Sequence, residues 1–199
     1  MRRWMNPIAL ILLVAGCAHQ TLPVAGGVTP LSDKEYSDII RRATVKANQY
    51  AGLYQTFQAD MTIETTEVQT AGLRQRGYFL QWDQKQYNTE REKILQEASA
   101  YAKYFLRFFS PEHEYDDLHK GKTIWRVYLE ANGQRFEGKV KKLTEKHVEV
   151  QTIYPHMDRF STPYEITFNV PMGTIEQAES KVTLTSSLGN AQYVFPVMK

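Results

Sequence analysis

The chain has 199 residues, of which 42% are hydrophobic and 23% are charged. This composition is that of a globular protein, and it argues against an intrinsically disordered chain. Basic and acidic residues number 24 and 22, so the formal net charge is only +2. The single cysteine, Cys17, excludes an internal disulfide framework and a structural zinc site built on cysteine pairs.

The first 16 residues have the layout of a secretory signal peptide. Arg2 and Arg3 precede an apolar run from Pro7 to Gly16, and a positive start followed by such a run directs a chain to export. The run is too short to cross a bilayer as a helix, which takes about 20 residues. We therefore expect residues 1–16 to be removed. Without Arg2 and Arg3 the chain carries 22 basic and 22 acidic residues, so the small positive charge belongs to the signal.

The four residues Val14-Ala15-Gly16-Cys17 resemble the lipobox of bacterial lipoproteins, in which an apolar residue and two small residues precede an obligatory cysteine. The resemblance implies that Cys17 receives a diacylglycerol on its sulfur and an acyl chain on its amino group. Two or three acyl chains make membrane attachment effectively permanent. Ala18 resembles the lipoproteins that are sorted to the outer membrane. The resemblance therefore implies a periplasm-facing protein anchored through Cys17 in the cell outer membrane, with the inner membrane as the less favoured alternative.

Residues 17–31 are expected to form the lipidated cysteine and a flexible tether. The segment after Cys17 contains two prolines and two adjacent glycines and shows neither helical nor strand periodicity. Such a segment behaves as a flexible coil. We therefore expect the globular part of the protein to begin at Ser32 and to comprise residues 32–199 as a single domain.

Residues 32–103 are expected to be mainly helical. Ser32 and Glu35 form a capping box, and apolar residues recur at helical spacing as far as about Tyr54. The period changes to two near residues 56–65, which predicts one half-buried strand with its polar residues toward solvent. Helical spacing returns between about residues 68 and 103. We expect this region to break near residues 87–88, before a second capping box at residues 89–92.

Residues 104–199 are expected to be rich in β-strands. The segment Tyr104–Phe109 is apolar on both faces, which predicts a central strand covered on both sides. Asn132-Gly133 lies between two alternating segments and is a strong hairpin signal, and residues 188–190 indicate another hairpin. The expected strands cover residues 104–109, 124–131, 134–141, 147–154, 164–170, 181–187 and 192–197.

Together these elements predict an α+β fold. Two or three N-terminal helices would pack on an antiparallel β-sandwich of about seven or eight strands. The helical part would cover about residues 32–103 and the sandwich part about residues 104–199. The order of the strands does not follow from the pattern.

One loop carries residue types that could bind a metal. The segment Glu112–His119 holds two histidines and four carboxylates, and its candidate metal ligands are His113, Asp116 and His119. Hard cations would accept the carboxylates, and zinc would accept the imidazoles. The spacing matches neither a helical His-Glu-x-x-His motif nor a calcium loop, so the favoured interpretation is a solvated acidic connection.

Two other segments could form interaction surfaces. The segment Tyr154–Phe160 includes Met157 and aromatic residues, which are typical of recognition surfaces when exposed. The favoured interpretation is that the segment folds back and closes one end of the sandwich. Lysines are frequent between Lys139 and Lys146, but they alternate with glutamates, and this pattern does not form the continuous basic stripe of a nucleic-acid-binding protein.

We expect a non-enzymatic binding or structural module that faces the periplasm. Its partners would be the membrane, through the lipid on Cys17, and another envelope protein. No catalytic constellation, cofactor or nucleic-acid partner is indicated by the motifs. The alternatives are a metal-dependent hydrolase that uses the Glu112–His119 loop and a carrier of a hydrophobic ligand.

Overall fold

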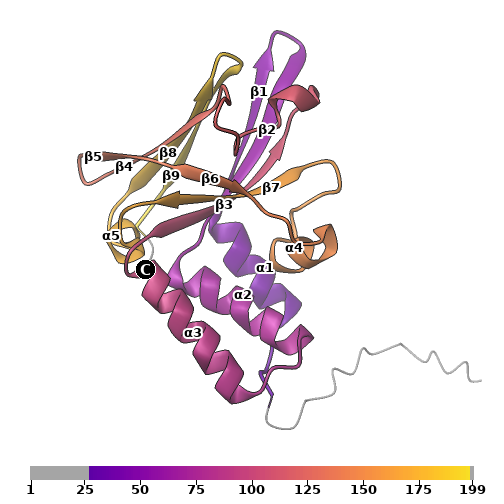
Figure 1. Ribbon diagram of the computed structural model, residues 1–199, viewed down its shortest axis with the longest axis vertical. Helices are drawn as coiled ribbons and strands as arrows, with labels where there is room; N and C mark the ends of the chain where they lie inside the picture. The colour runs from indigo at the N-terminus through magenta and orange to yellow at the C-terminus, as the bar shows by residue number, and fades with distance from the viewer. Residues whose placement is uncertain (1–26, 198–199) are drawn as a thin grey trace, which may run out of the picture.

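The computed structural model describes residues 27–197, which form five α-helices, nine β-strands and one short 3₁₀ helix (Figure 1). Cys17, the signal peptide and most of the expected tether lie outside these residues. The fold class is therefore α+β with two antiparallel sheets. None of the helices formed by residues 27–197 is long and apolar enough to cross a membrane.

The first sheet has five antiparallel strands in the order β1-β2-β3-β7-β6. Strand β3 lies at its centre, as the apolar pattern predicts, with β2 on one side and β7 on the other. The register places Asp60 opposite Arg107 and Thr62 opposite Phe105. The strands are β1 (Thr44–Ala51), β2 (Tyr54–Ile63), β3 (Ala102–Phe109), β6 (Lys139–Lys142) and β7 (Thr162–Phe168).

The second sheet has four antiparallel strands in the order β5-β4-β8-β9. Both predicted hairpins occur in it. Asn132 and Gly133 have positive φ values of 50° and 73°, as the turn between β4 and β5 requires, and Gly189 begins the strand that follows β8. The strands are β4 (Arg126–Ala131), β5 (Gln134–Glu137), β8 (Ser180–Ser186) and β9 (Gly189–Phe195).

The main hydrophobic core takes side chains from both sheets. Tyr104, Leu106 and Phe108 alternate along one face of β3 and are fully buried in this core. Residues of β4, β8 and β9 belong to the same core, and the Tyr193 hydroxyl donates a 3.1 Å hydrogen bond to the Ala59 carbonyl. The two sheets are thus joined by apolar packing and by a buried hydrogen bond.

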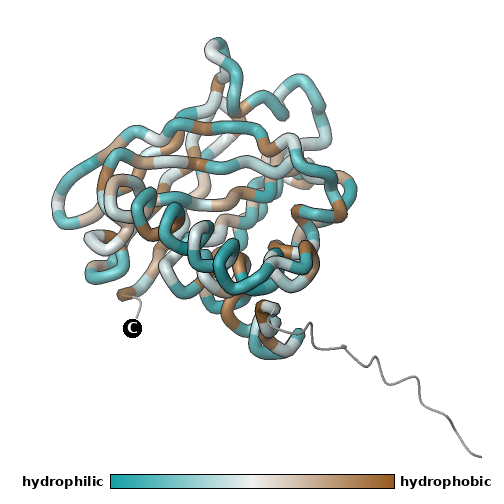
Figure 2. The backbone as a smooth tube through the Cα atoms, turned by 60° about the horizontal axis from the view of Figure 1, so that its bottom comes forward, coloured by the Kyte–Doolittle hydropathy of each residue, from teal (hydrophilic) through white to brown (hydrophobic). Residues whose placement is uncertain are grey.

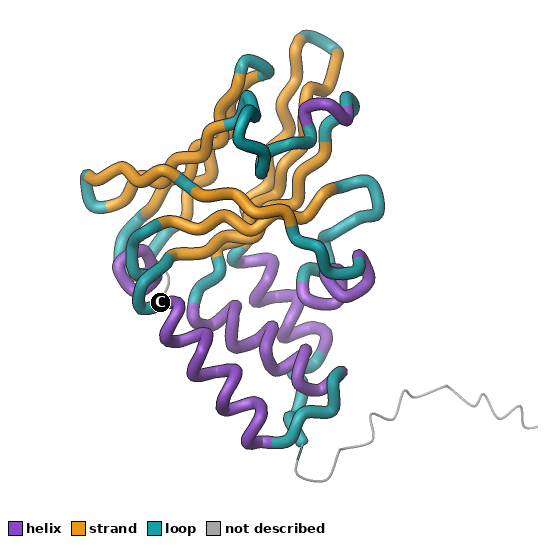
Figure 3. Tube along the Cα trace, viewed as in Figure 1, coloured by secondary structure: helices purple, strands orange, loops and turns teal. Residues whose placement is uncertain are grey.

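Three helices lie together below the strands in Figure 1, and Figure 3 separates these two parts by colour. They are α1 (Asp33–Arg42), α2 (Thr66–Phe79) and α3 (Gln84–Ala98). The predicted capping box is present at α1, where Glu35 N–H donates to the Ser32 hydroxyl and Ser32 N–H donates to the Glu35 carboxylate. Two shorter helices, α4 (His147–Ile153) and α5 (Met172–Glu176), occur among the strands.

The helix expected from Ser32 to about Tyr54 ends at Arg42, so the expected length was wrong. Strand β1 follows after one residue and pairs along its whole length with β2. The local sequence is compatible with both structures. Val45 and Ala47 are two residues apart, as on one face of a strand, whereas Ala47 and Tyr50 are three residues apart, as on one face of a helix. Pairing with β2 decides between them, and the region expected to contain one strand therefore contains two.

The division between α2 and α3 also differs from the expectation. The break lies at Leu80–Asp83, where Gln81 has a φ of 56° and the Asp83 side chain accepts from Gln86 N–H at 2.7 Å. The segment expected to break, residues 87–88, is inside α3. The second expected capping box is therefore wrong, and the Thr89 hydroxyl instead donates to the Lys85 carbonyl within the helix.

The segment expected as a strand at residues 147–154 is helix α4. Val150, Ile153 and Tyr154 are three and four residues apart, and this spacing places them on the same side of a helix. Val150 is buried there against Phe105 and Met157. Burial of this face on β3 outweighs the strand-like alternation of the local sequence.

The globular part begins before Ser32, because residues 27–31 pack on α2 rather than extending as a tether. Val28 is buried, and a Cβ atom on Gly77 would lie 3.2 Å from its Cγ2 atom. The Thr29 carbonyl accepts hydrogen bonds from the Arg74 side chain at 3.1 and 3.0 Å. Gly27 forms an isolated antiparallel bridge with Asp83.

Gly138 lies between β5 of the second sheet and β6 of the first sheet, where the chain crosses from one sheet to the other. A Cβ atom there would lie 2.9 Å from Ile166 Cγ2 and 2.9 Å from Phe168 Cε1. Both of these side chains are fully buried. The crossing therefore depends on the absence of a side chain at this position.

We predict that Gly138→Ala lowers the free energy of unfolding by about 1–3 kcal/mol, because the added methyl group overpacks the core. The measurement is urea-induced unfolding followed by circular dichroism. Gly121→Ala is the control, since a Cβ atom at Gly121 meets nothing within 4 Å. Equal stability of the Gly138→Ala variant and the wild type would contradict the prediction.

Candidate functional site

The polar residues of β2 and β3 line the face of the first sheet that points away from the second sheet. The sequence pattern predicts that the polar side of β2 faces solvent, and this is wrong for its second half, where Asp60 and Thr62 are buried. Arg107 of β3 is also buried, with 3% of its surface exposed. These side chains are buried because residues 143–161, which include α4 and are named the α4 segment below, lie across this face of the sheet.

The α4 segment is held on this face by an aromatic stack. The rings of Tyr154 and Phe105 are parallel within 2°, with their centroids 3.6 Å apart. Val150 and Met157 pack around the same phenylalanine. The segment therefore divides the face into a closed side, which contains Arg107, and an open side, which contains Glu64.

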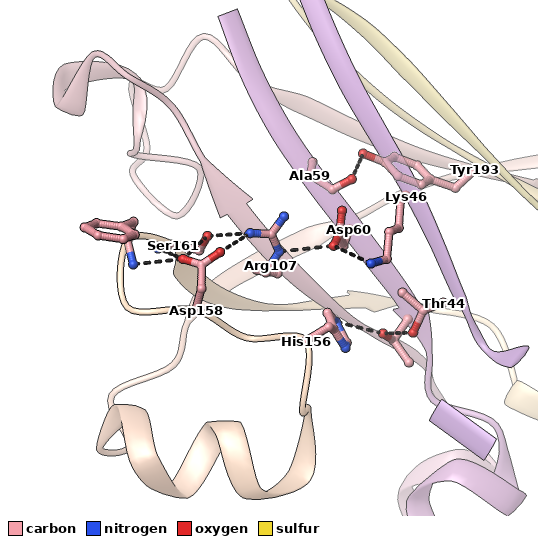
Figure 4. Close-up of polar contacts among 11 residues, drawn as sticks. Thr44, Lys46, Ala59, Asp60, Arg107, His156, Asp158, Ser161 and Tyr193 are labelled. Atoms are coloured by element: carbon pink, nitrogen blue, oxygen red, sulfur yellow. Dashed lines mark hydrogen bonds and ion pairs between the residues drawn. The ribbon is translucent and has the colours of Figure 1, made fainter. Parts of the chain in front are cut away.

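On the closed side, the buried Arg107 is the centre of an ion network in which the Asp60 side chain is buried and the Asp158 side chain is 46% exposed (Figure 4). Its Nε atom donates to Asp60 Oδ2 at 3.2 Å, and its Nη1 atom donates to Ser161 Oγ at 2.9 Å and to Asp158. Lys46 Nζ lies 3.9 Å from Asp60 Oδ2. The guanidinium thus connects β3 with β2 and with the loop after α4.

This network has a structural role in holding the α4 segment. Loss of one partner from a buried ion pair leaves the other charge unpaired and costs several kcal/mol, whereas the pair itself contributes little. Asp158 also accepts from the backbone N–H groups of Phe160 and Ser161, at 2.8 and 3.0 Å. Asp60 Oδ1 is buried with no hydrogen-bond partner among residues 27–197.

On the open side, a groove runs between α2 and α4. It consists of two adjoining hollows of about 370 and 250 Å³, which share Arg76, Leu143, Glu145, Ile153 and Tyr154 in their walls. The larger of these volumes is typical of ligand sites. The groove is the candidate functional site of the protein.

The two ends of the groove differ in chemistry. At one end the wall includes the apolar residues Phe79, Leu80 and Val150. At the other end Lys103 Nζ lies 2.6 Å from Glu97 Oε2 and 3.6 Å from Glu165 Oε2. The groove therefore combines an apolar end with a charged end.

Glu64 lies at the charged end, at the C-terminal end of β2. Burial raises the pKa of its carboxyl group, although the hydrogen bond from the Tyr154 hydroxyl, at 2.5 Å, and the nearby Lys103 and Arg76 lower it. The neighbouring Glu165 raises it further. Glu64 therefore keeps its proton to a higher pH than an exposed glutamate does, and a carboxyl group of this kind in a cleft is a frequent feature of binding and catalytic sites.

Acidic groups outnumber basic ones along the groove. Arg76 and Lys103 are its basic residues. The acidic residues in its walls are Glu64, Glu97, Glu145, Glu149 and Glu165. The groove therefore favours a positively charged group over an anion.

The three candidate metal ligands of the Glu112–His119 loop lie on another part of the molecule. Asp116 accepts hydrogen bonds from the hydroxyl groups of Thr162 and, at 2.8 Å, Tyr164. His119 lies beside the ring of Tyr164, with 5.8 Å between the ring centroids, and His113 is exposed in the 3₁₀ helix. Within residues 27–197 no three His, Cys, Asp or Glu side chains form a group that could hold a metal ion.

The Tyr154–Phe160 segment packs on the first sheet instead of closing the end of the two sheets. Met157 is buried against Phe105, and Tyr154 contributes to the groove. Phe160 is 75% exposed. The segment thus has both a packed part and a solvent-facing part.

Sequence analysis did not identify Glu64, Lys103 or Arg107 as site residues. Arg107 carried a usable signal, because a charged residue inside a strand that is apolar on both faces must find a buried partner. Glu64 and Lys103 carried no such signal, since both occupy positions that are polar in many strands. The environment of Glu64 depends on Tyr154, which is 90 residues away in the sequence, and that of Lys103 depends on Glu97 and Glu165.

His156 gives the folded protein a pH dependence that can be measured. Burial, together with Arg107 and Lys46, lowers the pKa of His156 to about 4 in the folded state, although Asp60 acts in the opposite direction. The unfolded chain therefore takes up this proton first as the pH falls below about 6.5. The contribution of His156 to stability is present at pH 7.5 and is lost between about pH 6.5 and pH 4.

We predict that this contribution amounts to about 3 kcal/mol between pH 7.5 and pH 4, and that His156→Gln removes it. Urea-induced unfolding of the variant and of the wild type at both pH values measures it, because the other titrating groups cancel in the comparison. His113→Gln, which replaces an exposed histidine, is the control. The same loss of stability in the His156→Gln variant and the wild type would contradict the assignment.

Comparison with protein-family models, with curated proteins and with solved structures finds no match to this chain. The function of the groove must therefore be inferred from its own chemistry. Three features describe that chemistry: the apolar wall at Phe79 and Leu80, the charged end around Lys103, and the buried carboxyl of Glu64.

Proposed function

We propose that the protein is a lipid-anchored binding module of the bacterial envelope. The anchor is Cys17, and the globular part faces the periplasm from the outer membrane. The sequence Val14-Ala15-Gly16-Cys17 supports the anchor. The groove between α2 and α4 supports the binding role, because it offers a partner both an apolar wall and an acidic rim.

The observation that carries the proposed binding role is the pairing of these two features in one groove. An apolar side chain of a partner gains free energy when it leaves water against the apolar wall residues Leu143 and Ile153. A lysine or arginine of the same partner is attracted by Glu145 and Glu149, which belong to the groove wall. The partner that fits is thus a protein segment with apolar side chains and positive charge.

We also propose that the two sheets form a β-sandwich and that α1, α2 and α3 pack on it as one layer. The shared apolar core and the hydrogen bond between Tyr193 and Ala59 support this arrangement. The contact of β1 with β9 supports it as well. In this arrangement the groove lies between the helical layer and the segment that crosses the outer face of the sandwich.

A carrier of a hydrophobic ligand is the second candidate function. It is supported by the hollow of about 370 Å³ beside Phe79 and Leu80, which is within the range of small-molecule sites. Mass spectrometry of the purified protein tests it, because a carrier retains a lipid that the Glu145→Lys/Glu149→Lys variant also retains. A peptide partner, in contrast, is lost from that variant.

We predict that cells supplied with radiolabelled palmitate incorporate the label into the wild-type protein and not into a Cys17→Ala variant. The reason is that only the thiolate of cysteine accepts the diacylglycerol readily. Labelled protein is measured after immunoprecipitation, with equal expression of the two forms verified by immunoblot. An unlabelled wild type, or a variant labelled to the same extent, would show that the proposed anchor is wrong.

The groove is tested with a photo-crosslinking amino acid at position 152. Thr152 belongs to the groove wall, whereas Leu53 is fully exposed in the turn between β1 and β2. We predict a discrete protein adduct from position 152 in intact cells and none from position 53. Because Glu145 and Glu149 attract the partner's positive charge, the double variant Glu145→Lys/Glu149→Lys should reduce this adduct by about tenfold or more.

Glu137→Lys is the matched charge reversal, since Glu137 is exposed in β5 and takes no part in the groove wall. It should leave the adduct from position 152 unchanged. The binding proposal fails if position 152 yields no adduct, or if Glu137→Lys and Glu145→Lys/Glu149→Lys reduce it equally.

A further inference from the structure

The turn between α2 and α3 exposes large apolar side chains. Phe79 and Leu80 are 58% and 59% exposed, and they follow Tyr78 at the end of α2. The positive φ of Gln81 reverses the chain there, and Trp82, which is half-buried, precedes α3. Residues 78–82 are named the aromatic turn below.

The chain that leads back to Cys17 leaves the domain at the aromatic turn. Gly27 pairs with Asp83, next to Trp82, and Val28 packs against Gly77. In Figures 1 and 3 the first described residues lie beside this turn, at the end of the helices that is distant from the strands. Figure 2 brings this end forward and shows hydrophobic residues in brown near the junction.

The distance from the anchor to this point is short. Gly27 is ten residues beyond Cys17, and a chain of ten residues spans at most about 35 Å. A lipid on Cys17 therefore keeps the aromatic turn near the bilayer surface. The hairpin of β1 and β2 extends from the opposite end of the molecule in Figure 1.

The residue types of the aromatic turn suit a membrane interface. Tyrosine and tryptophan are enriched where lipid headgroups meet hydrocarbon, and phenylalanine and leucine gain free energy in the acyl region. Arg76 and Lys85 flank the turn, and the one acidic residue between them, Asp83, accepts a hydrogen bond from Gln86 as the cap of α3. The flanks of the turn thus carry a small excess of positive charge for lipid phosphates, although Glu145 and Glu149 belong to the same groove wall as Phe79 and Leu80.

We propose that the aromatic turn inserts into the bilayer surface, so that the lipid on Cys17 and the side chains of Phe79 and Leu80 contact the same membrane. This inference rests on the proposed anchor at Cys17. It orients the domain with α2 and α3 toward the lipid and the hairpin of β1 and β2 toward the periplasm. The apolar end of the groove, which Phe79 and Leu80 line, then opens close to the bilayer.

Trp82 is a natural probe for this contact. After signal removal the chain contains two tryptophans, Trp82 and Trp125, and Trp125 is buried. The lipidated protein, purified from membranes, is reconstituted into phosphatidylcholine vesicles with or without bromine atoms on the acyl chains. We predict that brominated vesicles quench about a third of the tryptophan emission, because Trp82 reaches the interface and Trp125 does not.

The double variant Phe79→Ser/Leu80→Ser should lose most of this quenching, at least about threefold, because its turn no longer gains free energy in the acyl region. Leu53→Ser is the matched control, since Leu53 is equally apolar, fully exposed and at the opposite hairpin. It should retain the wild-type quenching. Circular dichroism verifies that each variant is folded.

Flotation of the same vesicles separates the two proposals. Protein that does not float with vesicles disproves the anchor at Cys17 and with it the membrane-facing turn. Protein that floats without quenching leaves the anchor intact and overturns the insertion of the aromatic turn. Equal quenching of wild type and the Phe79→Ser/Leu80→Ser variant overturns it as well.

Discussion

The structure depends on the burial of both faces of β3. On one face Tyr104, Leu106 and Phe108 enter the core that the two sheets share. On the other face Phe105 and Arg107 are covered by the α4 segment. A strand can be covered in this way only if its polar groups are paired, and Arg107 meets that condition through Asp60 and Asp158. The α4 segment is thus as necessary to the strand as the second sheet is.

The same interactions create the groove. The stack of Tyr154 on Phe105 and the ion pair of Arg107 with Asp158 hold the part of the α4 segment that follows the helix. Because the segment is held, the space between α4 and α2 is preformed, and Glu64 keeps its hydrogen bond from Tyr154. A preformed groove binds a partner without the entropic cost of ordering its own walls.

The proposed anchor at Cys17 would orient the domain, and with it the groove, relative to the membrane. Residues 27–31 pack on α2, so the proposed lipid on Cys17 would join the domain beside the aromatic turn. With this end toward the bilayer, the apolar end of the groove would lie close to the lipid. A partner could then be bound close to the membrane while the hairpin of β1 and β2 projects away from it.

Local sequence determined those features whose cause lies within a few residues. The capping box of Ser32 and Glu35, the turn of Asn132 and Gly133 and the two-sided burial of Tyr104–Phe109 all follow from neighbouring residues, and the structure confirms them. The lipobox resemblance belongs to the same class, but Cys17 lies outside the described residues and its lipidation stays a prediction.

Tertiary structure decided the features whose cause is distant. Strand β1 needed β2, helix α4 needed the side chain of Phe105, and the hydrogen bond that Glu64 accepts needs a tyrosine 90 residues away. The physical reason is that short segments with mixed periodicity are close in free energy as helix or strand, so burial against another element selects between them.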